Sequence, residues 1–141
     1  MNLYPITEKI IIGKRAVLEK ELFINEEIGR SVGVQFTCCR CENINTVELT
    51  PYESGFPVLQ LYDEGKVLSE NDLLKNGMAE ATSPDRLYLG KMTVSNLPTL
   101  YFGADCRSCA SKYIGIFSYG EKQPGLEMLK ISGIWNYSTS V

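Results

Sequence analysis

The chain has 141 residues, of which 44% are hydrophobic and 22% are charged, and its formal net charge is −3. This length predicts one domain over residues 1–141, and the composition is that of an ordinary globular protein, for which disorder is not the default. The absence of histidine excludes nucleophiles activated by an imidazole and zinc sites with an imidazole ligand.

The first residues carry no targeting or membrane signal. No basic region precedes an apolar run there, and the longest apolar stretch is Ile10-Ile11-Ile12. We therefore expect neither a signal peptide nor a membrane span. A chain without a secretory signal is expected in the cytoplasm, where thiols stay reduced.

Alternation of apolar and polar residues predicts a mainly β fold. The pattern is clearest in Val32–Cys38, whose apolar side chains share one face. The last predicted strand places Leu129, Ile131 and Trp135 on one face, so we expect all three in the core together. In chain order the predicted strands are 32–38, 46–49, 58–62, 100–102, 113–117 and 129–135.

Turn and helix signals are fewer. Gln123-Pro124-Gly125 is typical of a type II turn and predicts a hairpin with a loop of several residues between the last two strands. Residues 69–77 begin with a capping serine and an acidic turn and end with glycine, which predicts a short helix. Residues 14–28 fit a helix or a pair of strands, and residues 79–84 fit a loop.

Two cysteine pairs carry the strongest chemical signal. Cys38 and Cys41 are spaced as CxxC, and so are Cys106 and Cys109. This spacing lets one tight turn present two thiolates to one ion, with metal–sulfur distances of about 2.3 Å for zinc. Each pair lies between two predicted strands, so the four cysteines are expected to close one metal site.

The pattern resembles the zinc-ribbon class, in which two knuckles on β-hairpins share one tetrahedral zinc. The resemblance covers the two knuckles and their flanking strands, and it implies a structural Zn²⁺ held by the four cysteines. The gap between the pairs is longer than the usual spacing of about 15–20 residues. The extra closure entropy costs roughly 1.2 kcal/mol, against on the order of 10 kcal/mol from structural zinc. Glu42 and Ala110 stand where zinc knuckles often have glycine.

Other uses of the cysteines are less consistent with the sequence. Disulfides lack a secretory context, and a redox CxxC usually begins a helix, whereas both pairs here are flanked by strand patterns. Unrelated buried thiols are the simplest remaining alternative. Cys39 is left over, and it could replace Cys38 as a ligand if the knuckle turned differently.

Basic residues near the cysteines have two interpretations. Arg40 and Arg107 lie inside the knuckles, and Lys112 follows the second. They could offset the negative charge of a four-thiolate zinc site, or they could contact phosphate. We favour the first, because residues 42–105 hold ten acidic and four basic residues while the rest of the chain is net basic.

No catalytic constellation is evident. Glu26-Glu27 and Asp63-Glu64 are neighbours whose side chains point apart on a strand, and Gly13-Lys14 lacks the rest of a phosphate loop. The tyrosines fit a packed core better than a base-stacking surface. A zinc with four thiolates has no open position for water, so we expect a protein that is not an enzyme.

The sequence therefore predicts an α+β, mostly β fold, with an antiparallel sheet of hairpins, two zinc knuckles and one or two short helices. We expect a non-catalytic protein-binding domain, similar in general character to bacterial toxin-immunity proteins that neutralise basic toxins by charge. The alternative is a nucleic-acid-binding zinc ribbon. The residues expected to bind the protein partner are Asp63, Glu64, Glu70 and Asp72.

Overall fold

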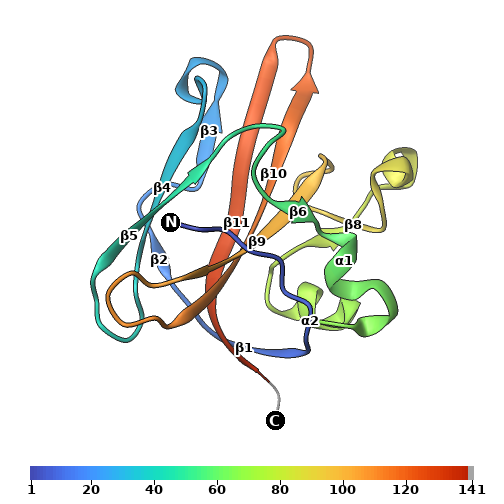
Figure 1. Ribbon diagram of the computed structural model, residues 1–141. Coiled ribbons are helices and arrows are strands. Elements are labelled where there is room, and N and C mark those ends of the chain that lie inside the picture. Colours follow the sequence, from blue (N-terminus) through green and yellow to red (C-terminus); the bar gives the residue numbers. More distant parts are fainter. Residues whose placement is uncertain (140–141) are drawn as a thin grey trace.

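Two antiparallel sheets organise residues 1–139, the part of the chain that the computed structural model describes (Figure 1). The first sheet contains β1 (Ile10–Arg15), β3 (Leu22–Ile24), β6 (Phe56–Pro57), β9 (Thr99–Asp105), β10 (Lys112–Gln123) and β11 (Leu126–Thr139). The second contains β2 (Val17–Leu18), β4 (Val32–Thr37) and β5 (Ile44–Leu49), and a small pair is formed by β7 (Glu80–Ala81) and β8 (Met92–Thr93). The helical segments are η1 (Asn25–Glu27), α1 (Leu59–Tyr62), η2 (Asp63–Gly65), α2 (Glu70–Lys75) and η3 (Pro84–Leu89). The predicted mostly β, α+β fold is confirmed.

The long hairpin of β10 and β11 forms the centre of the larger sheet. The strands of this sheet follow the order β1-β11-β10-β9-β6. Strand β1 pairs with the C-terminal half of β11, and β3 pairs with its N-terminal half. Gln123 pairs with Leu126, so Pro124-Gly125 forms a two-residue turn instead of a loop of several residues. Gly125 has a φ of 83°, as the third position of a type II turn requires. The strands are longer than predicted because β10 continues beyond its apolar stretch to Gln123.

The larger sheet is covered on both faces. One face packs against the smaller sheet, and the core between them includes Phe36, Val47, Phe102, Tyr113, Phe117, Leu129 and Ile131. The other face packs against the segment that contains α1, α2 and β8, with a core that includes Leu61, Leu73, Met92, Tyr101, Ile114 and Trp135. The part of the chain between β6 and β9 therefore folds as a layer of its own against the larger sheet.

Trp135 lies in a different core from the one predicted. The ring is buried, with 3% of its surface exposed, but it packs on the α1–α2 side while Leu129 and Ile131 pack on the side of the smaller sheet. Ile116 pairs with Gly133 and Phe117 pairs with Ile131, which leaves Ser132 as an extra residue in β11. A β-bulge of this kind reverses the alternation of side chains beyond it. The prediction of a shared face was wrong because it assumed a regular strand.

The segment 58–62 was predicted to be a strand and forms helix α1. Val58, Leu61 and Tyr62 are buried, whereas Leu59 and Gln60 are exposed. This spacing of i, i+3 and i+4 is that of a helix, and the amides of Val67 and Leu68 both donate to the carbonyl of Leu61 behind it. Tertiary packing overrides the strand preference of these residues.

The structure shows what forms in residues 14–28, in the predicted helix 69–77 and in the predicted loop 79–84. Residues 14–28 are mainly extended: they contain the end of β1, then β2, β3 and the short η1. The predicted helix is α2, whose cap Ser69 accepts a hydrogen bond from the amide of Asp72 at 3.0 Å. In the predicted loop 79–84, Glu80 and Ala81 form the short strand β7.

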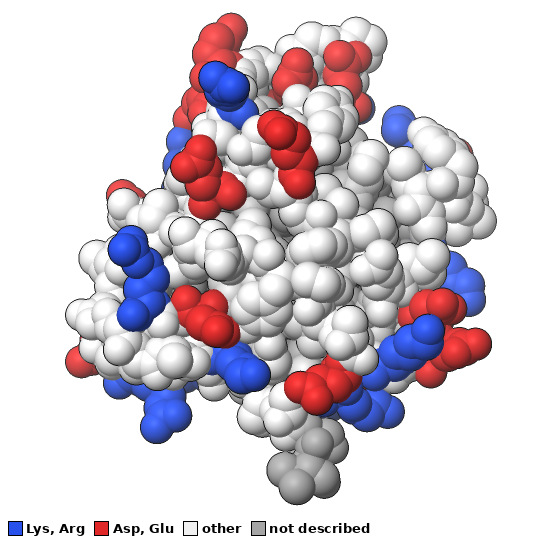
Figure 2. Space-filling view, in the orientation of Figure 1, with Lys and Arg blue, Asp and Glu red and all other residues white. Residues whose placement is uncertain are grey.

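Charged side chains are unevenly distributed over the surface. Acidic residues gather at the top of the view in Figure 2, whereas basic residues lie at the lower left, where the two cysteine loops lie in Figure 1, and also at the lower right, where acidic residues stand among them. None of the helices in residues 1–139 is long and apolar enough to cross a membrane.

Candidate metal centre

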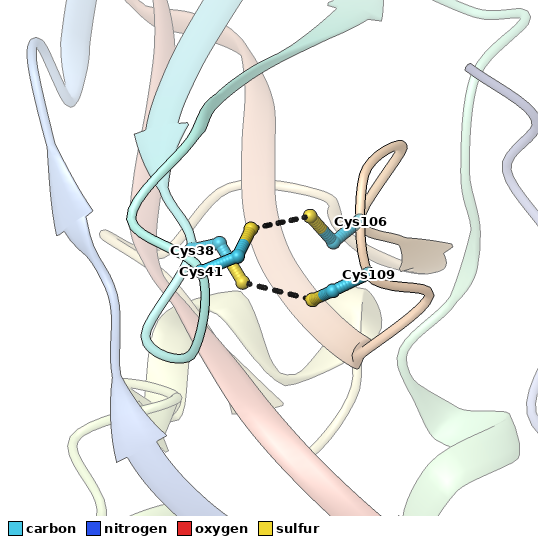
Figure 3. Close-up of side chains that lie close together, drawn as sticks. All are labelled: Cys38, Cys41, Cys106 and Cys109. Atoms are coloured by element: carbon cyan, nitrogen blue, oxygen red, sulfur yellow. Dashed lines mark hydrogen bonds between the residues drawn. The ribbon is translucent and has the colours of Figure 1, made fainter.

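The two cysteine pairs lie at the ends of two different hairpins. Cys38 and Cys41 follow β4 and precede β5, which belong to the smaller sheet. Cys106 and Cys109 connect β9 to β10 in the larger sheet. Figure 3 shows the two loops facing each other, with Cys41 directed at Cys106 and Cys38 at Cys109. A metal ion bound there would link the two sheets.

The four sulfur atoms have the spacing of a metal site. Sγ of Cys38 lies 3.6 Å from Sγ of Cys109, and Sγ of Cys41 lies 3.6 Å from Sγ of Cys106. All four sulfur atoms lie within 4.8 Å of one another. A tetrahedral zinc with Zn–S bonds of about 2.3 Å separates its sulfur ligands by about 3.8 Å. These separations are too long for disulfides, whose S–S bond is about 2.05 Å, and all five cysteines are free.

The two loops have the same backbone hydrogen bonds. The amide of Cys38 donates to the carbonyl of Asn43 at 2.9 Å, and the amide of Glu42 donates to the carbonyl of Cys38 at 3.1 Å. In the second loop Cys106 and Ser111 are joined at 2.8 Å, and Ala110 and Cys106 at 2.9 Å. The two CxxC pairs, each lying between two strands, thus form equivalent knuckles.

Glu42 and Ala110 adopt the conformation that glycine usually has in such turns. Their φ angles are 63° and 61°. For a residue with a Cβ atom this left-handed region costs roughly 1–2 kcal/mol. The absence of glycine after each second cysteine therefore does not change the knuckle, although it adds strain to it.

The first cysteine of each knuckle receives hydrogen bonds from its own loop and from the opposite hairpin. Sγ of Cys38 accepts from the Tyr113 hydroxyl at 3.1 Å and from the Arg40 amide at 3.4 Å. Sγ of Cys106 accepts from the Asn45 side-chain amide at 3.4 Å. Such donors stabilise thiolates and orient them toward a metal.

The ionisation of the sulfur atoms follows these contacts. Burial opposes ionisation of Cys38, but hydrogen bonds from the Cys41 amide, the Tyr113 hydroxyl and the Arg40 amide lower its pKa to about 6. The pKa of Cys106 is lowered in the same way, against burial, chiefly by the Cys109 amide and the Asn45 side chain. For Cys41, the Asn43 amide lowers the pKa, but burial and the neighbouring sulfur atoms outweigh it and raise the pKa to about 12. The surrounding groups thus favour the thiolate form of Cys38 and Cys106 and disfavour that of Cys41.

Solvent can reach one side of the cluster. Cys38 and Cys106 are buried, Cys41 is half-buried and Cys109 is exposed. Cys39 lies outside the cluster, because its sulfur points to the Lys14 carbonyl, 3.9 Å away. The structure thus places Cys38, and not Cys39, beside the other three cysteines.

The basic residues near the cysteines do not contact sulfur with their charged groups. Arg40, Arg107 and Lys112 are exposed, and none forms an ion pair within residues 1–139. The contact of Arg40 with Cys38 is made by its backbone amide. The backbone amide of Arg107 donates to Oδ1 of Asn45 at 2.9 Å.

Two residues of the site were missed in the sequence. Asn45 is buried on the inward-facing side of β5, where the neighbouring inward residues are Val47 and Leu49. A polar residue at an apolar position of an alternating strand was the available signal, but the predicted strand began at Thr46. Tyr113 was assigned to the core, and it is fully buried there, but its hydroxyl also reaches Cys38.

The predicted partner-binding acids lie away from the cysteines, on η2 and α2. Asp63 and Glu64 are exposed, and Glu70 forms an ion pair with Lys91 at 3.7 Å. Asp72 accepts a hydrogen bond from the Ser69 amide at 3.0 Å and so completes the cap of α2. Comparison of the chain with models of protein families, with curated proteins and with solved structures finds no match in any of the three.

Proposed function

We propose that this chain is a non-catalytic, zinc-stabilised domain that binds a basic protein, in the manner of immunity proteins that neutralise basic bacterial toxins. The observation that carries the proposal is the completeness of the four-cysteine cluster, whose sulfur atoms lie within 4.8 Å of one another. Four sulfur ligands occupy every position of a tetrahedral ion, so no position remains for a reactive water. Thiolates select zinc over hard cations such as magnesium and calcium.

The charge distribution supports a basic protein as the partner. Residues 42–105, which lie between the cysteine pairs, hold ten acidic and four basic residues. Asp63 and Glu64 are exposed and form no ion pair within residues 1–139. An acidic surface increases the association rate of a basic partner by electrostatic steering.

One observation favours the nucleic-acid alternative. The knuckle loops carry the exposed side chains of Arg40, Arg107 and Lys112, and basic residues gather over this part of the surface in Figure 2. A zinc ribbon that binds nucleic acid would contact phosphates with such residues. Binding of a basic protein should therefore depend on the acidic side chains, whereas binding of nucleic acid should depend on the basic side chains of the knuckle loops.

Affinity capture from the native host at low salt tests the proposal. The zinc-loaded protein is compared with Asp63→Lys/Glu64→Lys, with Arg40→Ala/Arg107→Ala, and with a control that makes the same charge change elsewhere, Glu19→Lys/Glu26→Lys. We expect the wild type and the arginine variant to retain a basic protein, identified by mass spectrometry, and the Asp63/Glu64 variant to lose it. Captured RNA or DNA that disappears only in the arginine variant would overturn the proposal in favour of the alternative. The zinc content of each variant confirms that the knuckles are intact.

A further inference from the structure

Segment η3 exposes large apolar side chains without contributing to the core. None of its six residues is buried, and Leu87 and Tyr88 are 56% and 77% exposed. In Figure 1 the segment projects from the body of the molecule, and in Figure 2 most of this projection is uncharged. Exposed apolar residues gathered on one projecting segment are typical of surfaces that bind another protein.

Two surface hollows meet at Tyr88. The first has a volume of about 770 Å³ and lies between η3 and the α1–η2 segment, where it includes Leu59. The second has a volume of about 730 Å³ and lies between η3, the turn that contains Tyr52, and the end of β10. Both hollows are lined by Pro57, Tyr88, Leu89 and Thr99. We call the combined feature the Tyr88 cleft.

Aromatic side chains border the cleft on both sides. Tyr52 is 89% exposed, yet its ring packs edge-on against Tyr119 with the ring centres 5.2 Å apart. Tyr88 and Tyr52 each line the second hollow. Tyrosine gives a large contact area at a low cost in conformational entropy, and it is enriched among the residues that dominate binding energies.

The rim of the cleft is acidic. The two hollows are lined by five acidic residues and two basic residues. Both basic residues already have acidic neighbours, since Arg86 lies 3.9 Å from Asp85 and Lys91 lies 3.7 Å from Glu70. The acidic lining residues without an ion pair in residues 1–139 are Glu53, Asp63, Glu64 and Glu121.

We infer that the Tyr88 cleft is the docking surface for a basic segment of the protein partner, an inference that rests on the proposed function. An apolar side chain of the segment packs against Leu87 and Tyr88, while its lysines and arginines face the acidic rim. This assignment includes the predicted residues Asp63, Glu64 and Glu70, and it leaves out Asp72, which does not line either hollow. Leu87 and Tyr88 supply most of the affinity, and the acidic residues of the rim supply electrostatic steering and selectivity for a basic segment.

Selection of a random peptide library on the immobilised, zinc-loaded protein tests the inference. We expect enriched peptides in which lysine or arginine surrounds a leucine or an aromatic residue. Binding of such a synthetic peptide should shift backbone amide signals of residues 52–64 and 84–91 in NMR spectra. Tyr88→Ala should weaken binding roughly tenfold or more, as expected for a central interface tyrosine. Ile44→Ala is the control, because Ile44 is 67% exposed and lies on β5 beside the first knuckle.

The outcomes separate the inference from the proposed function. Basic peptides that bind with equal affinity to wild type and Tyr88→Ala, and that shift amides elsewhere, would overturn the cleft as the docking surface and leave the basic partner in place. A selection that enriches no basic peptide would overturn both. Loss of binding in Ile44→Ala but not in Tyr88→Ala would move the docking surface to the knuckles. Thermal unfolding of each variant verifies that the folded state is retained.

Discussion

Tyr113 and Asn45 hold equivalent positions in the two knuckles, and each binds the first cysteine of the opposite knuckle. Each lies four residues after the second cysteine of its own pair. The Tyr113 hydroxyl accepts from the amide of Cys39 at 2.7 Å and donates to Sγ of Cys38 at 3.1 Å. The Asn45 side chain accepts from the amide of Arg107 at 2.9 Å and donates to Sγ of Cys106 at 3.4 Å. The two hairpins are thus joined across the cluster by side chains as well as by any bound ion.

Tyr113→Phe should weaken metal binding while preserving the core. The ring still fills its buried site against Phe36, but the Cys38 sulfur and the Cys39 amide each lose a partner. Loss of such a contact typically lowers metal affinity about 10–100-fold. Competition with a zinc chelator measures the effect. Tyr101→Phe is the matched control: it removes a buried hydroxyl that binds the Ile6 amide in the other core, so its zinc affinity should equal that of the wild type.

Replacement of Cys41 by serine should reduce zinc content and stability, whereas replacement of Cys39 should change neither. Cys41 is part of the sulfur cluster, whereas the sulfur of Cys39 lies 3.9 Å from the Lys14 carbonyl and its amide contact with Tyr113 does not depend on the side chain. We expect one zinc per chain by elemental analysis in wild type and Cys39→Ser. Cys41→Ser should lose the zinc and much of the stability, because structural zinc contributes on the order of 10 kcal/mol. Equal damage from the two changes would show that the ligands are misassigned.

Ala110→Gly should stabilise the second knuckle. Ala110 has a φ of 61°, so glycine removes a strain of roughly 1–2 kcal/mol and adds an entropic cost of roughly 0.5–1 kcal/mol. The net gain is between about 0 and 1.5 kcal/mol in the free energy of unfolding of the zinc-loaded protein. Ser108→Gly, in the same loop but at a residue without positive φ, should destabilise instead. A loss of stability in Ala110→Gly would contradict the assigned backbone strain.

The four-cysteine cluster could be predicted from the sequence because CxxC spacing is a local property of one turn. The donors around them could not, because the role of Tyr113 and Asn45 depends on the position of the opposite hairpin, which belongs to another sheet. Strand positions were mostly correct where apolar residues alternate. The prediction failed at 58–62, where a helix with only four residues shows little periodicity, and at Ser132, where one extra residue changes the face of every side chain that follows.

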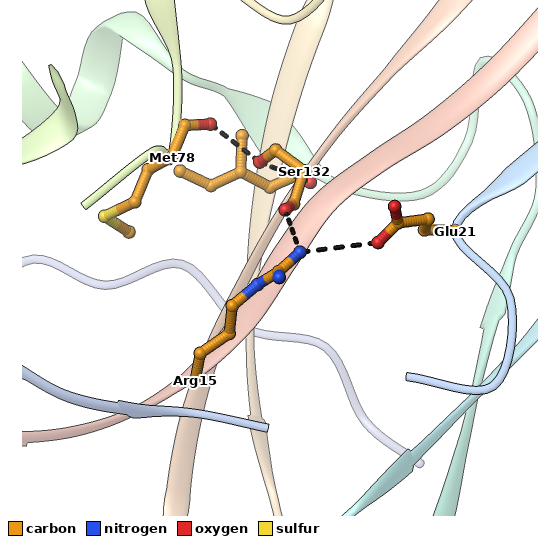
Figure 4. A network of polar contacts seen from close by, with 5 residues as sticks. Arg15, Glu21, Met78 and Ser132 are labelled. Carbon is orange, nitrogen blue, oxygen red and sulfur yellow. Dashed lines mark hydrogen bonds and ion pairs between the residues drawn. The ribbon is translucent and has the colours of Figure 1, made fainter. Parts of the chain in front are cut away.

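The bulge at Ser132 is held by a polar network (Figure 4). The Ser132 hydroxyl donates to the Met78 carbonyl at 2.7 Å, and the Ser132 carbonyl accepts from the Arg15 guanidinium at 2.7 Å. Arg15 also pairs with Glu21 at 3.4 Å. These contacts fix the extra residue and thereby direct Trp135 to the α1–α2 core.

Ser132→Ala should therefore cost about 1–3 kcal/mol in the free energy of unfolding, because the Met78 carbonyl loses its donor. Urea unfolding, followed by the fluorescence of Trp135, measures the change. Ser138→Ala is the control on the same strand, since Ser138 is exposed and its side chain forms no hydrogen bond within residues 1–139, so its effect should stay within about 0.5 kcal/mol. Equal stabilities of the two variants would mean that the network does not hold the bulge.

Asp72 should stabilise the helix α2, unlike the neighbouring Glu70. The hydrogen bond from the Ser69 amide lowers the pKa of Asp72, with smaller contributions from the Ser69 hydroxyl and Lys75. A carboxyl group whose pKa is lower in the folded state than in the unfolded state stabilises the fold fully above its unfolded value, near 3.8, and loses this contribution as the pH falls below it. Asp72→Ala should thus cost about 1 kcal/mol, equally at every pH well above 4.

Glu70→Ala is the matched control for Asp72→Ala in the same helical turn. Its ion pair with Lys91 is exposed, so its removal should cost less than about 0.5 kcal/mol, and added salt should abolish the difference. Urea unfolding of the zinc-loaded variants at two salt concentrations measures both effects. Glu70→Ala should weaken peptide binding, because Glu70 lines the Tyr88 cleft. Asp72→Ala should leave peptide binding unchanged, because Asp72 does not line the cleft. An Asp72→Ala variant with unchanged stability and weakened peptide binding would reverse this assignment and return Asp72 to the docking surface.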